Sequence, residues 1–221
     1  YIEINNDILN TLKLIIKADE QKFSLKFLNS LFKQKLSHKN ILHILKILKQ
    51  ENRIDLYLRT CKKAVRIDSY FQKCLFPYPY NLNINTIIDP ALLISIAKQE
   101  SEFFVHAKSS SGALGLVQVM PNTAKITAKR IGIKYDKDKL FTDANYNLTI
   151  GSNYLYSLIN HYEGSIVLAI AAYNAGPTNV NKWIKKYGDP REEEVNYITW
   201  IESIPYTETR NYVQRVLENY I

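Results

Sequence analysis

The chain is organised around the stretch Asp89–Pro121, DPALLISIAKQESEFFVHAKSSSGALGLVQVMP. Its first part predicts a helix, because Asp89 can cap the start and Pro90 fits the first helical position, where a missing N–H costs nothing. One face of this helix carries residues spaced i, i+3, i+4 and i+7, namely Leu93, Ile96, Ala97 and Glu100. A glutamate at the end of an apolar packing face is poorly hydrated, so we expect its pKa to be raised.

Glu100 is therefore a candidate general acid, because a carboxylic acid that keeps its proton near neutral pH can give it to a leaving group. The segment that follows, Lys108–Gly115, is rich in Ser and Gly and has neither helical nor strand periodicity. Loops of this composition let a ligand approach the backbone closely. The pattern alone leaves an alternative open, a helix end whose glutamate faces solvent and a loop that only connects.

A second informative stretch is SIVLAIAAYNAG, Ser165–Gly176, which is apolar nearly all round until Tyr173. A helix with no polar face belongs in the middle of a domain, and Gly176 and Pro177 are expected to end it. Tyr173 and Asn174 are thus polar groups at the end of a buried helix. Buried polar groups need partners, and either a ligand or nearby backbone can supply them.

Residues 1–75 predict successive amphipathic helices on short connectors, as in an α-solenoid. The stretch FPYPYNLNINT, Phe76–Thr86, interrupts this pattern. We therefore predict a helical segment over 1–80 and a second domain over 81–221, with Tyr78 and Tyr80 either wedging the two parts together or lining a sugar site. Because only a short ribbon within Ala107–Val119 could be extended, the predicted fold class is all-α.

Composition limits the classes of protein. The chain has 221 residues, 46% of them hydrophobic, so it can bury a sizeable core and is not disordered. No apolar run is long enough to span a membrane, and a first residue Tyr1 in place of Met indicates part of a longer product. The net charge of +8 suits an acidic polymer, although a merely solvated basic surface is the alternative. The lysines are scattered and no nucleic-acid motif is visible, so we expect no nucleic-acid partner.

The cysteines and histidines indicate no metal site. Cys61 and Cys74 match neither a metal-binding pattern nor a nucleophile–base pattern, and the four histidines do not cluster. A disulfide between the two cysteines is possible in an exported protein, but the interpretation we favour is a pair of free buried thiols. We expect no metal and no cofactor.

Four blocks of sequence, taken in order, resemble the catalytic domain of the soluble lytic transglycosylases, bacterial enzymes that cleave peptidoglycan glycan strands. The blocks are Glu100-Ser101, Gly112–Pro121 (GALGLVQVMP), Ala171–Gly176 (AAYNAG) and Glu202–Val213, which contains ESIP and ETRNYV. The resemblance covers about residues 85–221. It implies a lysozyme-like helical domain after a helical superstructure, peptidoglycan strands as the partner, and a periplasmic or cell-envelope location.

The resemblance also implies roles for individual residues. Glu100 would act first as acid and then as base, while the N-acetyl group of muramic acid stabilises the oxocarbenium-like centre and its C6 hydroxyl attacks C1. The product would be a 1,6-anhydro sugar. Substrate-contacting positions carried over from the motifs are Ser109, Gln118, Met120, Tyr173, Asn174 and Glu208. Arg210 and Glu202 are as readily interpreted as structural.

The chain departs from the family pattern at two places. Phe104-Val105 follows Phe103 where the family often has Asn-Pro, and Val117 stands where methionine is common. Both departures concern substrate contacts and neither changes the proton donor.

Two other functions stay open. Most glycosidases use two carboxylates, and the motif blocks offer no obvious partner for Glu100. Asp89 lies at the opposite end of the same helix, about 16 Å away, and Asp136, Asp138 and Asp143 lie in a segment without a motif. A hydrolase resembling goose-type lysozyme would need such a second carboxylate. A non-catalytic peptidoglycan-binding module would need neither Glu100 nor a second carboxylate.

Overall fold

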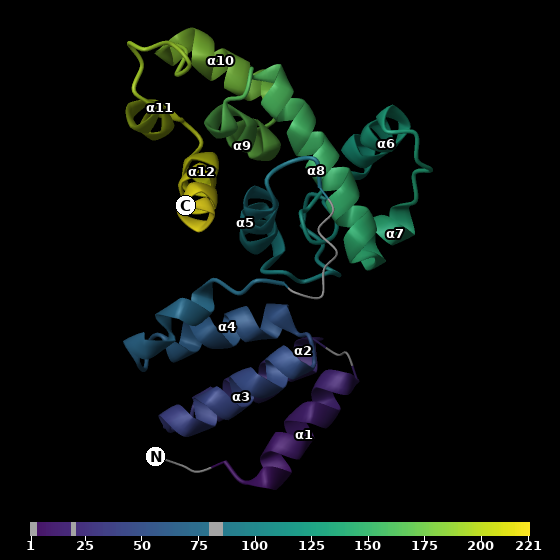
Figure 1. Ribbon diagram of the computed structural model, residues 1–221, viewed down its shortest axis with the longest axis vertical. Helices are drawn as coiled ribbons and strands as arrows, with labels where there is room; N and C mark the ends of the chain where they lie inside the picture. Colours follow the sequence, from purple (N-terminus) through teal and green to yellow (C-terminus); the bar gives the residue numbers. More distant parts are fainter. Residues whose placement is uncertain (1–3, 19–20, 80–85) are drawn as a thin grey trace. The chain divides into compact units, whose positions relative to one another are not determined.

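The structure is a computed structural model that describes residues 4–18, 21–79 and 86–221 (Figure 1). Every regular element within these ranges is a helix, which confirms the all-α prediction. The chain forms two compact units, residues 1–81 and 82–221, called unit 1 and unit 2 below. The predicted boundary at 80/81 and the ring of Tyr80 lie outside the described residues. Within the described part, no helix is both long and apolar enough to cross a membrane.

Unit 1 is built from amphipathic helices whose apolar faces share one core. The helices are α1 (Asn6–Lys17), α2 (Gln21–Phe32), α3 (His38–Gln50), α4 (Ile54–Ala64) and the 3₁₀ helix η1 (Ser69–Leu75). Ser37 caps α3 as its position suggests, with its hydroxyl accepting a hydrogen bond from the Asn40 N–H at 3.3 Å. Leu12, Ile44 and Leu56 are fully buried in the core, so the periodicity of this part of the sequence identified its inward faces.

A disulfide joins Cys61 of α4 to Cys74 of η1. The prediction of free thiols was therefore wrong, and both cysteines are bonded. The cause is the chain reversal at 65–68, which returns η1 onto α4 and brings the two Cα atoms to 5.7 Å, a separation that a disulfide can bridge. The spacing of the cysteines in the sequence does not reveal that reversal.

Unit 2 places one apolar helix among several others (Figure 1). Its helices are α5 (Pro90–Ser101), α6 (Pro121–Arg130), α7 (Lys137–Thr142), α8 (Ala144–His161), α9 (Ile166–Ala175), α10 (Pro177–Tyr187), α11 (Tyr197–Ser203) and α12 (Thr207–Tyr220). Helix α9 packs against α8, α10 and α12, and α12 also packs against α5. The residues 168–172 are all buried, because a helix with no polar face must be covered on every side.

Side chains suited to capping begin three helices of unit 2: Asp89 caps α5, as predicted, and Asp143 and Ser165 cap α8 and α9. Asn122 and Thr123 would also suit the start of a helix, but α6 begins at Pro121, with Met120 in the cap position. Proline is well suited to the first position of a helix, so it extends α6 by a residue.

The loop between α5 and α6 is held by turns and not by a sheet. Where a short ribbon was expected, two isolated antiparallel bridges occur, Lys108 with Leu114 and Leu114 with Val119. Leu114 thus pairs with both arms of the loop, and the loop is compact at the C-terminal end of α5.

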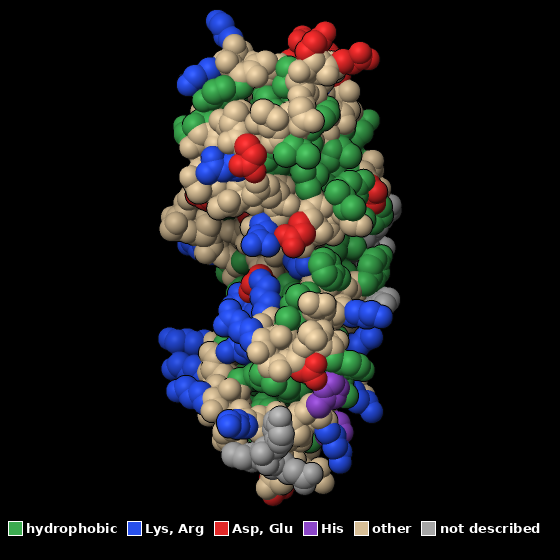
Figure 2. All heavy atoms as spheres, turned by 90° about the vertical axis from the view of Figure 1, so that its left-hand side faces the viewer, with side chains coloured by type: hydrophobic (Ala, Val, Ile, Leu, Met, Phe, Trp, Pro, Cys, Tyr) green, Lys and Arg blue, Asp and Glu red, His purple; other side chains and the backbone are tan. Residues whose placement is uncertain are grey.

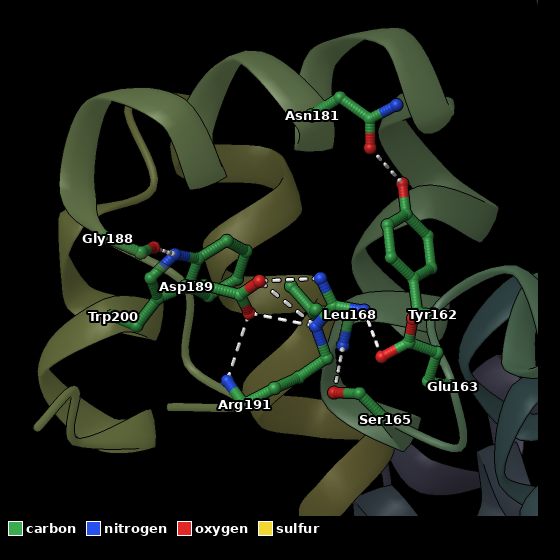
Figure 3. Close-up of polar contacts among 9 residues, drawn as sticks. All are labelled: Tyr162, Glu163, Ser165, Leu168, Asn181, Gly188, Asp189, Arg191 and Trp200. Carbon is green, nitrogen blue, oxygen red and sulfur yellow. Dashed lines mark hydrogen bonds and ion pairs between the residues drawn. The ribbon is translucent and has the colours of Figure 1, made fainter. Parts of the chain in front are cut away.

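An ion-pair cluster fixes the long connection between α10 and α11 (Figure 3). The Arg191 guanidinium donates to the Asp189 carboxylate, with an Nε–Oδ1 distance of 2.9 Å, and pairs with Glu163 at 3.0 Å. The indole N–H of buried Trp200 donates to the Gly188 carbonyl at 3.1 Å. These bonds tie the connection to the C-terminal end of α8 and to α11.

Candidate active site

Glu100 lies in the last turn of α5, where the helix meets the loop that follows it. The preceding residues of its face, Leu93, Ile96 and Ala97, are buried as predicted. Burial of the carboxyl raises the pKa of Glu100 from its ordinary value of 4.5 to about 7. At neutral pH a substantial fraction of Glu100 is therefore protonated and able to donate.

Two tyrosines from neighbouring helices lie near this carboxyl: Tyr212, which is buried, and Tyr173, which is partly buried. Tyr212 of α12 interacts with Glu100 through its hydroxyl, and this interaction partly offsets the effect of burial on the glutamate's pKa. The buried Tyr212 hydroxyl forms no hydrogen bond within the described part of the chain, so it lies near the carboxyl with its proton available. Burial, followed by the charge of Glu100, raises the pKa of Tyr212 and of Tyr173 on α9 well above 10. Both phenols therefore stay neutral and can act as hydrogen-bond donors.

Glu208 also acts on Glu100. It is exposed in the first turn of α12, and its negative charge contributes to the raised pKa of Glu100. The structure thus places two carboxyl groups within electrostatic range of each other, a partly buried one on α5 and an exposed one on α12. Burial and this neighbouring negative charge both favour the protonated form of Glu100.

Tyr173 connects this centre to the loop between α5 and α6. Its hydroxyl donates to the Val117 carbonyl at 2.7 Å, and its ring lies 5.3 Å from that of Tyr154 between centroids. Helix α8 comes close at the same point, because Gly151 carries no side chain. A Cβ there would collide with the Val117 side chain and lie 3.3 Å from the Tyr173 hydroxyl oxygen.

The buried amide of Asn147 holds the other side of this loop. Its nitrogen donates to the carbonyls of Leu114 and Leu140, both at 2.9 Å, and its oxygen accepts from the Val117 N–H at 3.0 Å. Gly115 allows this approach, since it has φ +78° and a Cβ there would lie 2.6 Å from the Leu140 oxygen. One side chain on α8 therefore fixes the loop, which in turn fixes Tyr173.

The predicted loop residues Ser109 and Gln118 stabilise the loop itself. The Ser109 hydroxyl accepts from the Ala113 N–H at 2.9 Å. The amide nitrogen of Gln118 donates to the carbonyls of Ala107 at 3.1 Å and Gly115 at 2.8 Å, while its backbone has φ +47°. Any contact that Gln118 makes with a ligand must therefore use its amide oxygen or its backbone.

The remaining predicted site residues differ in their surroundings. Met120 is 43% exposed at the start of α6, so its thioether is open to a ligand. The Asn174 oxygen accepts from the Thr209 hydroxyl at 2.7 Å, which ties α9 to α12 one residue after Glu208. Arg210 donates to the Ile204 carbonyl at 3.1 Å, and Glu202 accepts from Gln214 at 2.6 Å. These last bonds lie within the final two helices and the turn that joins them, and they agree with a structural interpretation of both residues.

Three of the four other carboxylates considered from the sequence cap helices. Asp89 accepts from the Ala91 N–H at 2.8 Å and from the Tyr220 hydroxyl at 3.0 Å. Asp136 and Asp143 cap α7 and α8, and Asp138 lies in the first turn of α7. The structure therefore gives Asp89, Asp136 and Asp143 roles in helix capping, and Glu208 is the carboxylate it couples to Glu100.

The sequence did not single out Tyr212 or Asn147 as site residues. Tyr212 lies inside the block ETRNYV, four residues after Glu208, so the helical spacing i, i+4 on α12 could have indicated that both face the same neighbour. Asn147 occurs on an otherwise apolar helix face beside Leu148 and Gly151, and a buried amide in such a place signals a polar partner.

Comparisons with known proteins all identify the same family. A family profile described as Transglycosylase SLT domain matches residues 83–196, just over half of the chain. Two curated relatives are the soluble lytic murein transglycosylases of Escherichia coli K12 and Salmonella typhimurium LT2. The first is 34% identical over 148 residues, covering 64% of this chain and 22% of the relative; the second is 36% identical over 131 residues, covering 59% and 20%. The chain thus matches about a fifth of each relative's length.

A solved structure gives the same result in three dimensions. The 70 kDa soluble lytic transglycosylase Slt70 of Escherichia coli superposes with a TM-score of 0.82 at 25% identity, over 100% of this chain and 36% of that one. The likeness includes the lysozyme-like helical architecture of the relative. Profile, relatives and fold agree, and the chain belongs to the Transglycosylase SLT domain family.

Proposed function

We propose that the chain is a lytic transglycosylase that cleaves the β-1,4 bond between N-acetylmuramic acid and N-acetylglucosamine in peptidoglycan. The observation that carries the proposal is the partly buried Glu100 carboxyl, with a pKa of about 7, close to two neutral tyrosines. The relatives named above are both called soluble lytic murein transglycosylases, which supports the proposal. Peptidoglycan lies outside the cytoplasmic membrane, so this function corresponds to the periplasm or cell envelope.

Glu100 supplies the proton in the first half of the reaction. Its protonated carboxyl donates to the glycosidic oxygen, the bond from that oxygen to C1 breaks, and positive charge develops at C1. The N-acetyl group of the muramic acid stabilises that charge, which removes the need for a second enzyme carboxylate beside C1.

The now ionised Glu100 serves as base in the second half. It takes the proton from the C6 hydroxyl of the same sugar, whose oxygen attacks C1 and closes a 1,6-anhydro ring. The carboxyl ends as it began, protonated, and no water is consumed. A pKa near 7 suits both halves, because the group must give and recover one proton at the same pH.

The tyrosines position the acid in this proposal. The Tyr212 hydroxyl favours the ionised form of the nearby Glu100 carboxyl and is available to donate to it, while Tyr173 is oriented by the Val117 carbonyl. Ser109, Gln118, Met120, Asn174 and Glu208 are proposed to contact or border the glycan strand. The bonds of Ser109 and Gln118 to the loop backbone hold that contact surface in shape.

A hydrolase with water as the acceptor is the second candidate, and Glu208 is the observation in its favour. Its carboxylate is exposed and close enough to Glu100 to raise that residue's pKa, so it could activate a water molecule. A non-catalytic wall-binding module would have no need of a carboxyl whose burial disfavours its ionised form.

Mass spectrometry of the muropeptides released from purified sacculi tests the proposal. We expect products one water lighter than those of hydrolysis, and no release by the Glu100→Gln variant. The matched control is Glu218→Gln, an exposed glutamate on α12 that pairs with Arg215. Products with ordinary reducing ends would show a hydrolase, and release by Glu100→Gln would exclude Glu100 as the acid.

A further inference from the structure

The net positive charge of the protein belongs entirely to unit 1. Residues 1–81 contain 15 Lys and Arg against 7 Asp and Glu, whereas residues 82–221 contain 14 of each sign. Figure 2 shows Lys and Arg side chains gathered over unit 1, while the visible face of unit 2 carries both signs. The unit without the proposed active site thus has the stronger attraction for an anionic polymer.

Part of this charge surrounds a hollow between α3 and η1. The hollow has a volume of about 760 Å³, within the usual range for ligand sites of about 300–1,000 Å³. A smaller hollow of about 160 Å³ adjoins it and shares Lys49, Tyr57, Lys73 and Cys74. We call the larger one the α3–η1 hollow. The residues used below from its lining are Lys46, Lys49, Tyr70, Phe71 and Lys73.

The aromatic wall of the hollow is held in place before any ligand arrives. Tyr70 is 65% exposed, yet its ring packs edge-on against His38 and Phe71, at centroid distances of 4.5 and 5.5 Å. Asp68 accepts from the Tyr70 N–H at 2.8 Å and from the His38 ring nitrogen at 2.9 Å. An exposed ring that is already oriented loses little conformational entropy when a ligand stacks on it.

The cationic wall faces the same space. Lys46 and Lys49 are exposed on α3, Lys73 is exposed on η1, and the lining includes no Asp or Glu from the described part of the chain. The Cys61–Cys74 disulfide fixes η1 to α4 and so fixes this wall. The site therefore combines several ammonium groups with a fixed aromatic face.

We propose that the α3–η1 hollow binds a peptidoglycan strand, with stem-peptide carboxylates at Lys46 and Lys73 and a sugar ring on Tyr70. The proposal rests on the function proposed above and adds a second substrate site, on unit 1. A saccharide ring is amphipathic and suits an exposed phenol, and the carboxylates match the charge of the wall. An anionic lipid surface fits less well, since it is broad and flat whereas this site is concave. Binding at a second site on one chain slows release of a polymeric substrate.

Binding to soluble, uncross-linked peptidoglycan strands with intact stem peptides tests the proposal. All proteins carry Glu100→Gln, so that the strands are not cut. We expect Lys46→Ala with Lys73→Ala to weaken binding about three- to tenfold at low salt, and less as salt increases, as for exposed ion pairs. Tyr70→Ala should weaken binding about two- to tenfold at every salt concentration. The matched controls are Lys33→Ala with Lys35→Ala, two exposed lysines of unit 1, and Phe23→Ala, which removes a ring 60% exposed elsewhere on unit 1.

Strands whose carboxylates have been converted to amides complete the test. They should bind the starting protein as weakly as intact strands bind the lysine variant, and that variant should lose nothing further. Equal losses in the Lys33 and Lys35 control would overturn the proposal in favour of diffuse charge. Binding to anionic lipid vesicles or to single-stranded DNA that needs the same residues, without binding to strands, would also overturn it.

The two proposals fail separately. Cleavage of sacculi by the protein with Glu100 restored, combined with unchanged strand binding in the hollow variants, would leave the activity standing and remove the second site. Strand binding that depends on the hollow, combined with no cleavage product, would retain the site and remove the proposed activity.

Discussion

Replacing Glu100 with glutamine should stabilise unit 2, and the gain should depend on pH. The carboxyl is partly buried at the end of α5, so its ionised form is poorly solvated in the folded protein. Glutamine keeps the shape and never ionises. The variant therefore removes the cost of burying a charge while it removes the proposed catalytic acid.

The magnitude follows from the pKa of Glu100. An unfolded glutamate ionises near 4.5, whereas in the folded state this one keeps its proton up to about pH 7. Between these values the folded protein holds more protons, so the free energy of unfolding of the wild type falls as pH rises through that window. At 1.36 kcal/mol per pKa unit the full penalty is about 3 kcal/mol, complete above about pH 7 and negligible below about pH 4.

Urea unfolding followed by tryptophan fluorescence measures this effect in unit 2 alone, because Trp183 and Trp200 are the protein's two tryptophans and both are buried there. We expect Glu100→Gln and wild type to unfold together near pH 4. Near pH 8 the variant's midpoint should be higher by about 1–2 M urea, for a slope of about 2 kcal/mol per molar. Glu218→Gln, an exposed control, should show no such pH-dependent difference. A stability difference that is the same at both pH values would refute the burial argument.

Three further substitutions test the surroundings of Glu100 and the disulfide of unit 1. Tyr212→Phe removes the hydroxyl that lowers the pKa of Glu100. The alkaline limb of the pH–activity profile should therefore move to higher pH, and turnover should fall at least about tenfold. An unchanged profile would argue against this contact. Asn147→Ala removes three buried hydrogen bonds and should lower the free energy of unfolding of unit 2 by about 3 kcal/mol in the fluorescence assay. A loss below about 1 kcal/mol would show that the loop between α5 and α6 is held by other means. Cys61→Ser with Cys74→Ser should cost unit 1 about 3 kcal/mol in urea unfolding followed by circular dichroism, and full stability in that variant would show that η1 needs no covalent tie.

The local features of the fold could be predicted because they depend on neighbours in the sequence. Asp89 with Pro90 began α5 as expected, and Ser165 began α9. The raised pKa of Glu100 was also foreseeable, since it follows from the position of an acid on an apolar helix face. Each of these inferences uses only the periodicity of a helix and the chemistry of its ends.

The remaining features depend on contacts between residues far apart in the sequence. The Cys61–Cys74 disulfide required the reversal of the chain after α4, which no spacing rule describes. Asn147 contacts a loop 30 or more residues earlier, and Tyr212 reaches Glu100 from another helix. The electrostatic link between Glu100 and Glu208 likewise arises only when α12 packs against α5. Tertiary packing decides all of these.

The central claim is that burial keeps the Glu100 carboxyl protonated near neutral pH. The most direct measurement is a pH titration of isotope-labelled glutamate carboxyls by NMR, with the Glu100→Gln variant identifying the resonance that disappears. We predict a midpoint near pH 7 for that resonance. A midpoint near the ordinary value of 4.5 would contradict the account, because Glu100 would then be ionised at neutral pH and could not serve as the acid.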